Sequence, residues 1–167
     1  MAQEIYEKDN ISAYKQCVAK LNKLFKLLHQ EVCGPCIKYT KYGCCWGITE
    51  NNESSKIDEI RKEIYASAKK KGKKLNGRCR YWEAKKGCIL DVFKPPECAA
   101  IWCIAPSIQE RYGIKYDSEK IYQALVNIEL DVREENGMIH RGFDPESAKK
   151  LEEYISSMID AVEKFQK

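Results

Sequence analysis

The sequence predicts a mainly α protein, a helical scaffold around an irregular, cysteine-rich centre, with one short hairpin. Two observations indicate this class. Apolar residues recur at spacings of three and four near both ends of the chain, which is typical of amphipathic helices. Between these parts, residues 33–103 contain eight of the nine cysteines. We expect a single domain over residues 1–167, with a cysteine-rich region at 33–105 and a helical scaffold at 1–32 and 106–167.

Residues 3–32 are predicted to form one long helix. Its apolar stripe consists of Ile11, Tyr14, Val18, Leu21, Leu24, Phe25, Leu28 and Val32. Cys17 lies beside this stripe, far along the chain from the other cysteines, and we interpret it as a small buried apolar residue.

A polar loop, ENNESSK, separates this helix from a second one. Ser54 or Ser55 is expected to cap the second helix. Its inward positions are Ile57, Ile60, Ile64 and Ala68. Gly72 and the Asn76-Gly77 pair predict its end and a turn.

The next segment is predicted to be a short hairpin followed by a short helix. CRYW and CILDVF form the two arms, joined by EAKKG. Pro95 and Pro96 end the second arm and open the helix ECAAIWCIA, which Pro106 is expected to close. Cys98 therefore lies near a helix N-terminus, whose partial positive charge favours a thiolate.

The C-terminal part is predicted to form two helices. The first spans 118–135, places Ile121, Leu125, Ile128 and Val132 on one face, and ends at Asn136-Gly137. Asp144 caps the second helix and Pro145 takes its first position. The apolar stripe of this second helix consists of Leu151, Tyr154, Ile155, Met158, Val162 and Phe165.

The composition indicates a globular chain that does not cross a membrane. Its 44% apolar residues, 32% charged residues and net charge of +4 are ordinary for a folded domain. No apolar run approaches the roughly 20 residues that a spanning helix needs. The segment MAQEIYEKDN carries no apolar run, so we expect no secretory signal and a cytoplasmic location. In a reducing cytoplasm, hyperthermophiles apart, structural disulfides are not expected.

The clustered cysteines predict a metal centre. Thiolates suit zinc and iron-sulfur clusters, and a Cys-x-x-Cys turn brings two sulfurs to one metal. Eight thiolates also match the number needed for two four-thiolate sites. The candidate ligands are Cys33, Cys36, Cys44, Cys45, Cys79, Cys88, Cys98 and Cys103.

The segment Cys33-Gly34-Pro35-Cys36 also matches a thioredoxin-type redox motif. That chemistry places the motif after a buried strand and at the start of a helix. Here a long amphipathic helix precedes it and no buried strands surround it, which argues against the redox interpretation.

The order of residues resembles the YkgJ-type eight-cysteine family of zinc- or iron-chelating domains. The resemblance lies in CGPCIKYTKYGCCWG and GRCRYWEAKKGCILDVFKPPECAAIWC, and covers about residues 33–105. Family members often carry arginine-proline before the seventh cysteine and arginine after it, whereas this chain has Lys94-Pro95-Pro96 and Ala99. The resemblance implies a bound metal centre without identifying the metal or the reaction.

The choice of metal stays between iron-sulfur and zinc. Two zinc sites would use all eight sulfurs, whereas one 4Fe-4S cluster needs four. We favour iron-sulfur because the cysteines exceed what one structural zinc requires. Aromatic and apolar neighbours could shield a cluster or be ordinary core: Tyr39, Tyr42, Trp46, Tyr81, Trp82, Ile89 and Trp102.

We therefore expect a metalloprotein that serves electron transfer, or cluster-dependent chemistry with a redox or protein partner. The alternative is a structural-zinc module that recognises nucleic acid or a partner protein through the basic stretch 69–86, where Tyr81 and Trp82 could stack bases. Whether the chain is an enzyme stays open. No phosphate-binding loop occurs, and the sequence has only two histidines, His29 and His140, which nearly excludes a catalytic triad. The basic residues are Lys69, Lys70, Lys71, Lys73, Lys74, Arg78, Arg80, Lys85 and Lys86.

Overall fold

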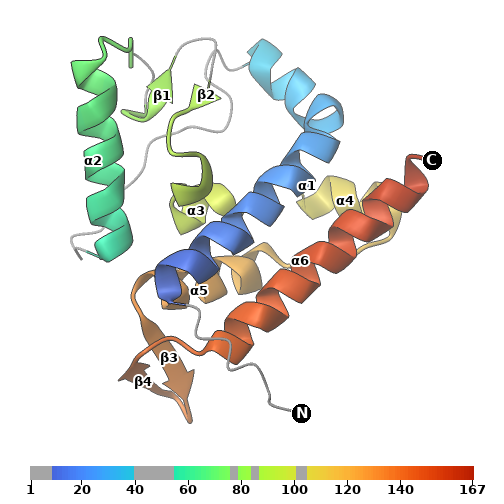
Figure 1. The fold of residues 1–167 in the computed structure, drawn as a ribbon. Helices are drawn as coiled ribbons and strands as arrows, with labels where there is room; N and C mark the ends of the chain where they lie inside the picture. The colour runs from blue at the N-terminus through green and yellow to red at the C-terminus, as the bar shows by residue number, and fades with distance from the viewer. Residues whose placement is uncertain (1–8, 40–54, 76–78, 84–86, 101–104) are drawn as a thin grey trace, which may run out of the picture.

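The computed structural model describes residues 9–39, 55–75, 79–83, 87–100 and 105–167, with the backbone alone described at 29–39 and 105–107. Within these ranges it contains six α-helices, one 3-10 helix and two antiparallel two-stranded sheets (Figure 1). The predicted mainly α class is confirmed. In the same ranges, no helix combines the length and apolar character that crossing a bilayer would require.

Helix α1 (Asn10–Tyr39) differs from the predicted 3–32 at both ends, because Asp9 is not helical and the helix runs on to Tyr39. It begins after Asp9, whose carboxylate accepts the Ser12 N–H at 2.7 Å and so caps the first turn. Its helical backbone continues past residue 32 and includes the segment Cys33–Cys36. Cys17 is fully buried, which confirms its interpretation as a core residue.

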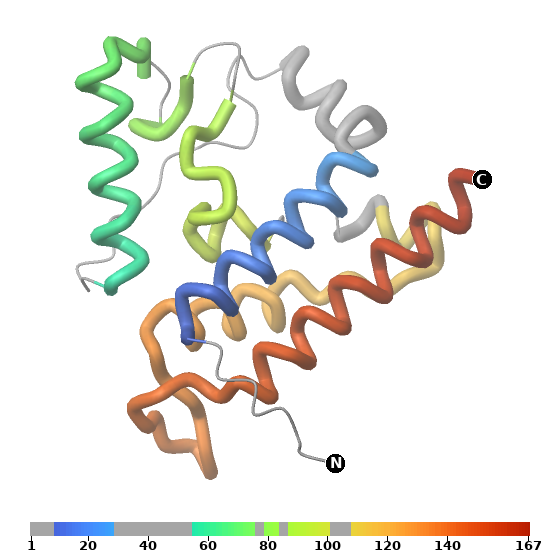
Figure 2. Tube along the Cα trace, viewed as in Figure 1, coloured from blue at the N-terminus to red at the C-terminus, as the bar shows by residue number. Residues whose placement is uncertain are grey.

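Helix α6 (Pro145–Phe165) lies along α1 and runs in the same direction (Figure 1; Figure 2). The direction follows from polar contacts at successive levels. Near the middle of both helices, the Lys20 ammonium donates to the Ser156 hydroxyl at 2.7 Å. Further along, the Gln166 amide donates to the Leu27 carbonyl at 3.1 Å. The two longest helices therefore form the frame on which the other elements pack.

Helix α5 (Ser118–Glu129) completes the main core beneath α1 and α6. Asp117 caps it by accepting the Lys120 N–H at 3.0 Å. As predicted, Asp144 caps α6, and Pro145 takes its first position. The buried apolar residues of the three helices include Tyr14, Val18, Leu21, Leu24, Leu28, Ile121, Leu125, Ile128, Leu151, Ile155, Met158 and Val162.

The predicted helix over 118–135 is wrong in its last turns. α5 ends at Glu129, and Val132 belongs instead to strand β3 (Val132–Glu135), which pairs with β4 (Met138–Arg141). Asn136 and Gly137 have φ angles of +52° and +75°, as a type I′ hairpin turn requires. The Asn-Gly pair therefore closes a hairpin and does not end a helix.

Helix α2 (Lys56–Lys70) lies on the opposite side of α1 from α6 (Figure 1). Of the two serines considered, Ser55 caps it, accepting the Asp58 N–H at 2.9 Å. A hairpin is present where one was predicted: β1 (Trp82–Glu83) pairs antiparallel with β2 (Gly87–Cys88). Its strands are shorter than the predicted arms, and Asp91–Phe93 of the second arm forms a 3-10 helix instead.

Three short helices follow the β1–β2 hairpin: η1 (Asp91–Phe93), α3 (Pro96–Ala99) and α4 (Ala105–Tyr112). The predicted helix over 97–105 is wrong in its extent, because α3 ends at Ala99, and Pro106 lies in the first turn of α4 instead of at a helix end. A proline is tolerated there because the first-turn N–H groups have no partner within the helix.

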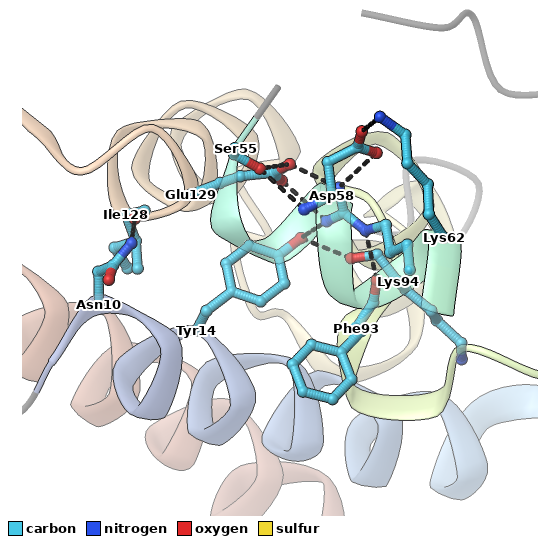
Figure 3. A network of polar contacts seen from close by, with 10 residues as sticks. Asn10, Tyr14, Ser55, Asp58, Lys62, Phe93, Lys94, Ile128 and Glu129 are labelled. Atoms are coloured by element: carbon cyan, nitrogen blue, oxygen red, sulfur yellow. Dashed lines mark hydrogen bonds and ion pairs between the residues drawn. The ribbon is translucent and has the colours of Figure 1, made fainter. Parts of the chain in front are cut away.

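A buried polar network joins α1, α2, α5 and the segment after β2 (Figure 3). Arg61, which is 4% exposed, forms two parallel hydrogen bonds to the Glu129 carboxylate, at 2.5 and 2.8 Å. It also donates to the Tyr14 hydroxyl at 3.1 Å and to the Phe93 carbonyl at 2.7 Å. Burial raises the pKa of Tyr14 well above its usual range, and its hydroxyl donates to the Lys94 carbonyl. The network therefore fixes where α2 and the β2–η1 segment meet the core.

We predict that Arg61→Ala lowers the free energy of unfolding by about 3–5 kcal/mol, because the Glu129 carboxylate would stay buried without its cation. Urea denaturation measures the difference. Lys62→Ala is the matched control: Lys62 pairs with Asp58 at 2.9 Å on the same helix, but its side chain is 62% exposed. The control should change stability little, because water screens exposed pairs. Equal effects from both variants would contradict the role of the network.

Candidate metal centre

The eight predicted ligands fall into three groups. Cys79, Cys88 and Cys98 have described side chains. Cys33 and Cys36 lie in the last turns of α1, where the backbone alone is described. Cys44, Cys45 and Cys103 lie outside the described residues.

The β1–β2 hairpin brings Cys79 and Cys88 together. Cys79 precedes β1, and a turn returns the Trp82 N–H to the Cys79 carbonyl at 3.1 Å. Cys88 ends β2 directly opposite Trp82. Both thiols belong to a small apolar cluster with the buried Tyr81 and Leu90, separate from the main core. Two cysteines nine positions apart in the chain thus belong to one apolar cluster.

The surroundings of Cys88 suit a thiolate ligand. Burial is the largest effect on its thiol and raises the pKa, and the neighbouring Cys79 raises it further. Opposing this, the backbone N–H groups of Leu90 and Asp91 and the positive charge of Lys94 lower the pKa. N–H groups and cations near a sulfur favour its charged form. The apolar surroundings therefore disfavour an isolated thiolate, while these neighbours favour the charged form that a metal would bind.

The turn after Cys88 is held in an uncommon backbone conformation. Asp91 has a φ angle of +47°, in the left-handed region that residues other than glycine seldom adopt. The Asn22 side-chain amide of α1 donates to both the carbonyl and the carboxylate of Asp91, at 3.3 Å each. Asn22 also accepts from the Lys94 ammonium at 2.7 Å. Helix α1 thus holds in place the turn that follows Cys88.

Cys98 lies in a different environment. It is exposed and belongs to α3, whose first turn places its N–H on the Pro95 carbonyl at 2.9 Å. Its predicted position near a helix N-terminus is confirmed. Cys98 therefore belongs to a solvent-facing turn, whereas Cys79 and Cys88 belong to the apolar cluster.

The segment Cys33–Cys36 lies at the opposite end of its helix from the end where a thioredoxin-type redox motif lies. It falls in the C-terminal turns of α1, whereas thioredoxin-type chemistry needs a helix N-terminus to stabilise the thiolate. A separation of three residues in a helix places the two positions on one face. The helical backbone thus agrees with the argument against the redox interpretation.

Cys79 and Cys88 make up the described part of the candidate centre. Among the described side chains, no group of three or more cysteines, histidines or acids is placed to hold a metal ion. Two thiolates supply half of the ligands of a tetrahedral zinc or of a four-iron cluster. Further ligands would come from the remaining predicted cysteines.

The basic stretch 69–86 contains one feature that the sequence alone does not predict. Lys69, Lys70, Lys71, Lys73 and Lys74 are exposed at the end of α2, as predicted. Tyr81, however, is only 4% exposed, inside the cluster that contains Cys79. The expectation that Tyr81 could stack on a base is therefore wrong in this fold.

Neither histidine adds to the described site. The side chain of His29 lies outside the described residues. His140 is half-buried on β4, at the opposite end of the molecule from β1 and β2 (Figure 1).

Sequence analysis missed Arg61 as a buried residue that positions the site. Its spacing was the available signal, because Arg61 continues the inward face of Ile57, Ile64 and Ala68. Its partner Glu129 had no such signal, because the two residues meet only when α2 packs near the end of α5.

Comparison with known proteins found no relative: no protein-family model, no curated protein and no solved structure matches the chain.

We predict an order of alkylation for the cysteines of the metal-depleted protein. Among the four cysteines with described side chains, iodoacetamide should modify the exposed Cys98 first, the half-buried Cys88 more slowly, Cys79 more slowly again, and the fully buried Cys17 only on unfolding. The raised pKa of Cys88 also keeps less of it as the reactive thiolate near pH 8. Peptide mapping by mass spectrometry measures the order, and modification of Cys17 before Cys98 would contradict the fold.

Proposed function

We propose that this chain is a cysteine-ligated metalloprotein, and that its centre is an iron-sulfur cluster, with 4Fe-4S favoured. Cys79 and Cys88 supply two thiolates. Further ligands come from Cys33, Cys36, Cys44, Cys45, Cys98 and Cys103. The proposal rests chiefly on the Cys79–Cys88 pair, two cysteines of one apolar cluster, where the backbone N–H groups of Leu90 and Asp91 favour the charged form of Cys88. The resemblance to the YkgJ-type family supports the same class of centre.

The apolar surroundings of Cys79 and Cys88 explain why a metal would be retained by these two cysteines. A buried thiol pair is unfavourable as two thiolates, because each negative charge opposes the other in apolar surroundings. A cation held by Cys79 and Cys88 would remove this cost, and the Leu90 and Asp91 N–H groups would favour the charged form of Cys88. The protein contribution is therefore a prearranged pair of ligands, held in place by the contacts of Asn22 and Arg61 with the segment after Cys88.

An iron-sulfur centre would supply one-electron chemistry, with a potential tuned by hydrogen bonds to the sulfurs and by solvent exposure. The role that follows is electron transfer, or cluster-dependent chemistry with a protein partner. The apolar cluster around Tyr81 and Leu90 would shield one side of the centre. The backbone N–H groups of Leu90 and Asp91 would favour the reduced state of the centre, which carries more negative charge.

We expect anaerobically purified protein to be brown and to contain iron and acid-labile sulfide, with visible absorption that dithionite bleaches reversibly. Cys79→Ser and Cys88→Ser should each lose most of the iron, because each removes one thiolate of the pair. Cys17→Ala is the matched control, since Cys17 is a buried cysteine in the main core. It should retain the iron. Iron content that is unchanged in both serine variants would remove the assignment.

The second candidate function is a structural-zinc module that binds nucleic acid or an acidic partner. The exposed lysines at the end of α2 favour it, because Lys69, Lys70 and Lys71 are consecutive and exposed in the last turn and C-cap. A colourless protein with stoichiometric zinc would select this function over the first.

If the zinc module is correct, binding to nucleic acid should weaken steeply as salt rises, because lysine contacts to phosphates release counterions. Replacing Lys69, Lys70 and Lys71 by Gln should reduce both the affinity and the salt slope. Lys149 and Lys150, an exposed pair on α6, give the matched control when replaced in the same way. Fluorescence anisotropy measures both quantities, and binding that is absent or independent of salt would exclude this function.

A further inference from the structure

The β3–β4 hairpin lies at the end of the molecule opposite the candidate metal centre (Figure 1). Met138 and Ile139, successive residues of β4 and therefore on opposite faces of the hairpin, are 61% and 75% exposed. Among the described residues, they are two of four large apolar side chains with substantial exposure. An isolated two-stranded hairpin is only marginally stable in water. A further strand added beside β4 would give both side chains cross-strand neighbours.

The register identifies which backbone groups of β4 are available for pairing. The Glu135–Met138 pair flanks the two-residue turn and therefore exchanges both its hydrogen bonds across the hairpin. The pattern alternates, so the next such pair is Arg133–His140. Beyond it, the Gly142 N–H bonds to the Asp131 carbonyl at 2.7 Å, which keeps the same alternation. The N–H and carbonyl of Ile139, between these pairs, consequently point away from β3.

The outer edge of β4 has no strand beside it among the described residues, where the sheet is two-stranded. The carbonyl of Arg141, the next outward position, already accepts from the Arg133 guanidinium at 2.9 Å. Ile139 is therefore the centre of the available edge.

The two edges of the hairpin differ in their protection against pairing. β3 carries Arg133, Glu134 and Glu135, and charged side chains of this kind prevent another strand from adding to an edge. β4 reads Met138, Ile139, His140 and carries a permanent charge only at its last residue. Strand addition is thus blocked at β3 and open at β4.

We propose that β4 pairs antiparallel with β4 of a second copy of this chain, with Ile139 opposite Ile139 of the partner subunit. The two hairpins would form one four-stranded sheet about a two-fold axis. In this register Met138 lies opposite His140 of the partner subunit, and Arg141 lies opposite Gly137 of the partner subunit. The exposed apolar residues gain cross-strand neighbours, and no like charges face each other.

Charge excludes several of the alternative arrangements. Centring the axis on Arg141 places two arginines opposite each other, and self-pairing of β3 about Glu134 or about Arg133 also opposes two like charges. Like charges directly opposite each other on a sheet destabilise the pair. Among the registers of β4 that avoid such pairs, the one centred on Ile139 places the most exposed of the described large apolar side chains opposite its own copy.

The interface is small, so the dimer should form reversibly. Each strand contributes four residues, and contacts well below about 1,200 Å² of buried area belong to weak, transient complexes. We expect the weight-average mass of the full chain to rise from the monomer value toward twice that value over about two orders of magnitude in concentration. Sedimentation equilibrium on the purified full chain measures this.

Two substitutions test the edge itself. Ile139→Pro deletes only the outward N–H, so the bonds between β3 and β4 remain, and Ile139→Lys brings two lysines together at the axis. Each should weaken self-association at least about tenfold. Glu134→Pro is the matched control, because it deletes the outward N–H on the β3 edge of the same hairpin and should associate like the wild type. Far-UV circular dichroism confirms that the helices persist in each variant.

A wild-type chain that stays monomeric at the highest concentration overturns the proposal. So does a dimer that both Ile139 variants leave intact, or one that Glu134→Pro weakens as strongly as Ile139→Pro.

Discussion

The Arg61 guanidinium joins four segments that are distant in sequence, and the placement of the β1–β2 hairpin depends on it. A buried guanidinium keeps its charge at any relevant pH, so it must be matched by a carboxylate and by hydrogen-bond acceptors. Glu129 supplies the carboxylate, while Tyr14 and the Phe93 carbonyl accept the remaining donors. Such a pair contributes less to net stability than its contacts suggest, because both charges are removed from water. It fixes the relative placement of α2, α5 and η1, because any other placement leaves a buried charge unpaired.

The candidate centre depends on this placement because its own apolar cluster is small. Cys79, Tyr81 and Leu90 are the buried members, and strands of two residues each cannot hold them in place alone. Phe93 packs against both this cluster and the main core, and its carbonyl is the one that Arg61 holds. The distance from the Cys88 thiol to the helical scaffold is therefore set a few residues downstream, at Phe93 and Lys94.

The elements that were predicted correctly carry complete local signals. In α6 the Asp144 cap, the first-turn Pro145 and the apolar stripe all lie within one stretch of chain, and α2 carries its Ser55 cap and inward face in the same way. The β3–β4 hairpin was missed because Asn136-Gly137 suits both a helix end and a type I′ turn. The positive φ angles at both residues decide for the turn. The cap and apolar stripe of a helix depend on neighbours in sequence. The choice between a helix end and a hairpin turn at Asn136-Gly137 depends instead on how the flanking residues pack in the fold.

By itself, the sequence determined the helical class, the caps and inward faces of the long helices, and the set of cysteines from which a centre can be built. These follow from periodicity and side-chain chemistry, which act over a few residues. Only the tertiary structure decided that Cys79 and Cys88 belong to one apolar cluster, that Tyr81 is buried, and that Arg61 forms an ion pair with Glu129. Those outcomes depend on how a hairpin, a helix and a core pack against one another, and no local pattern encodes a contact between residues 61 and 129.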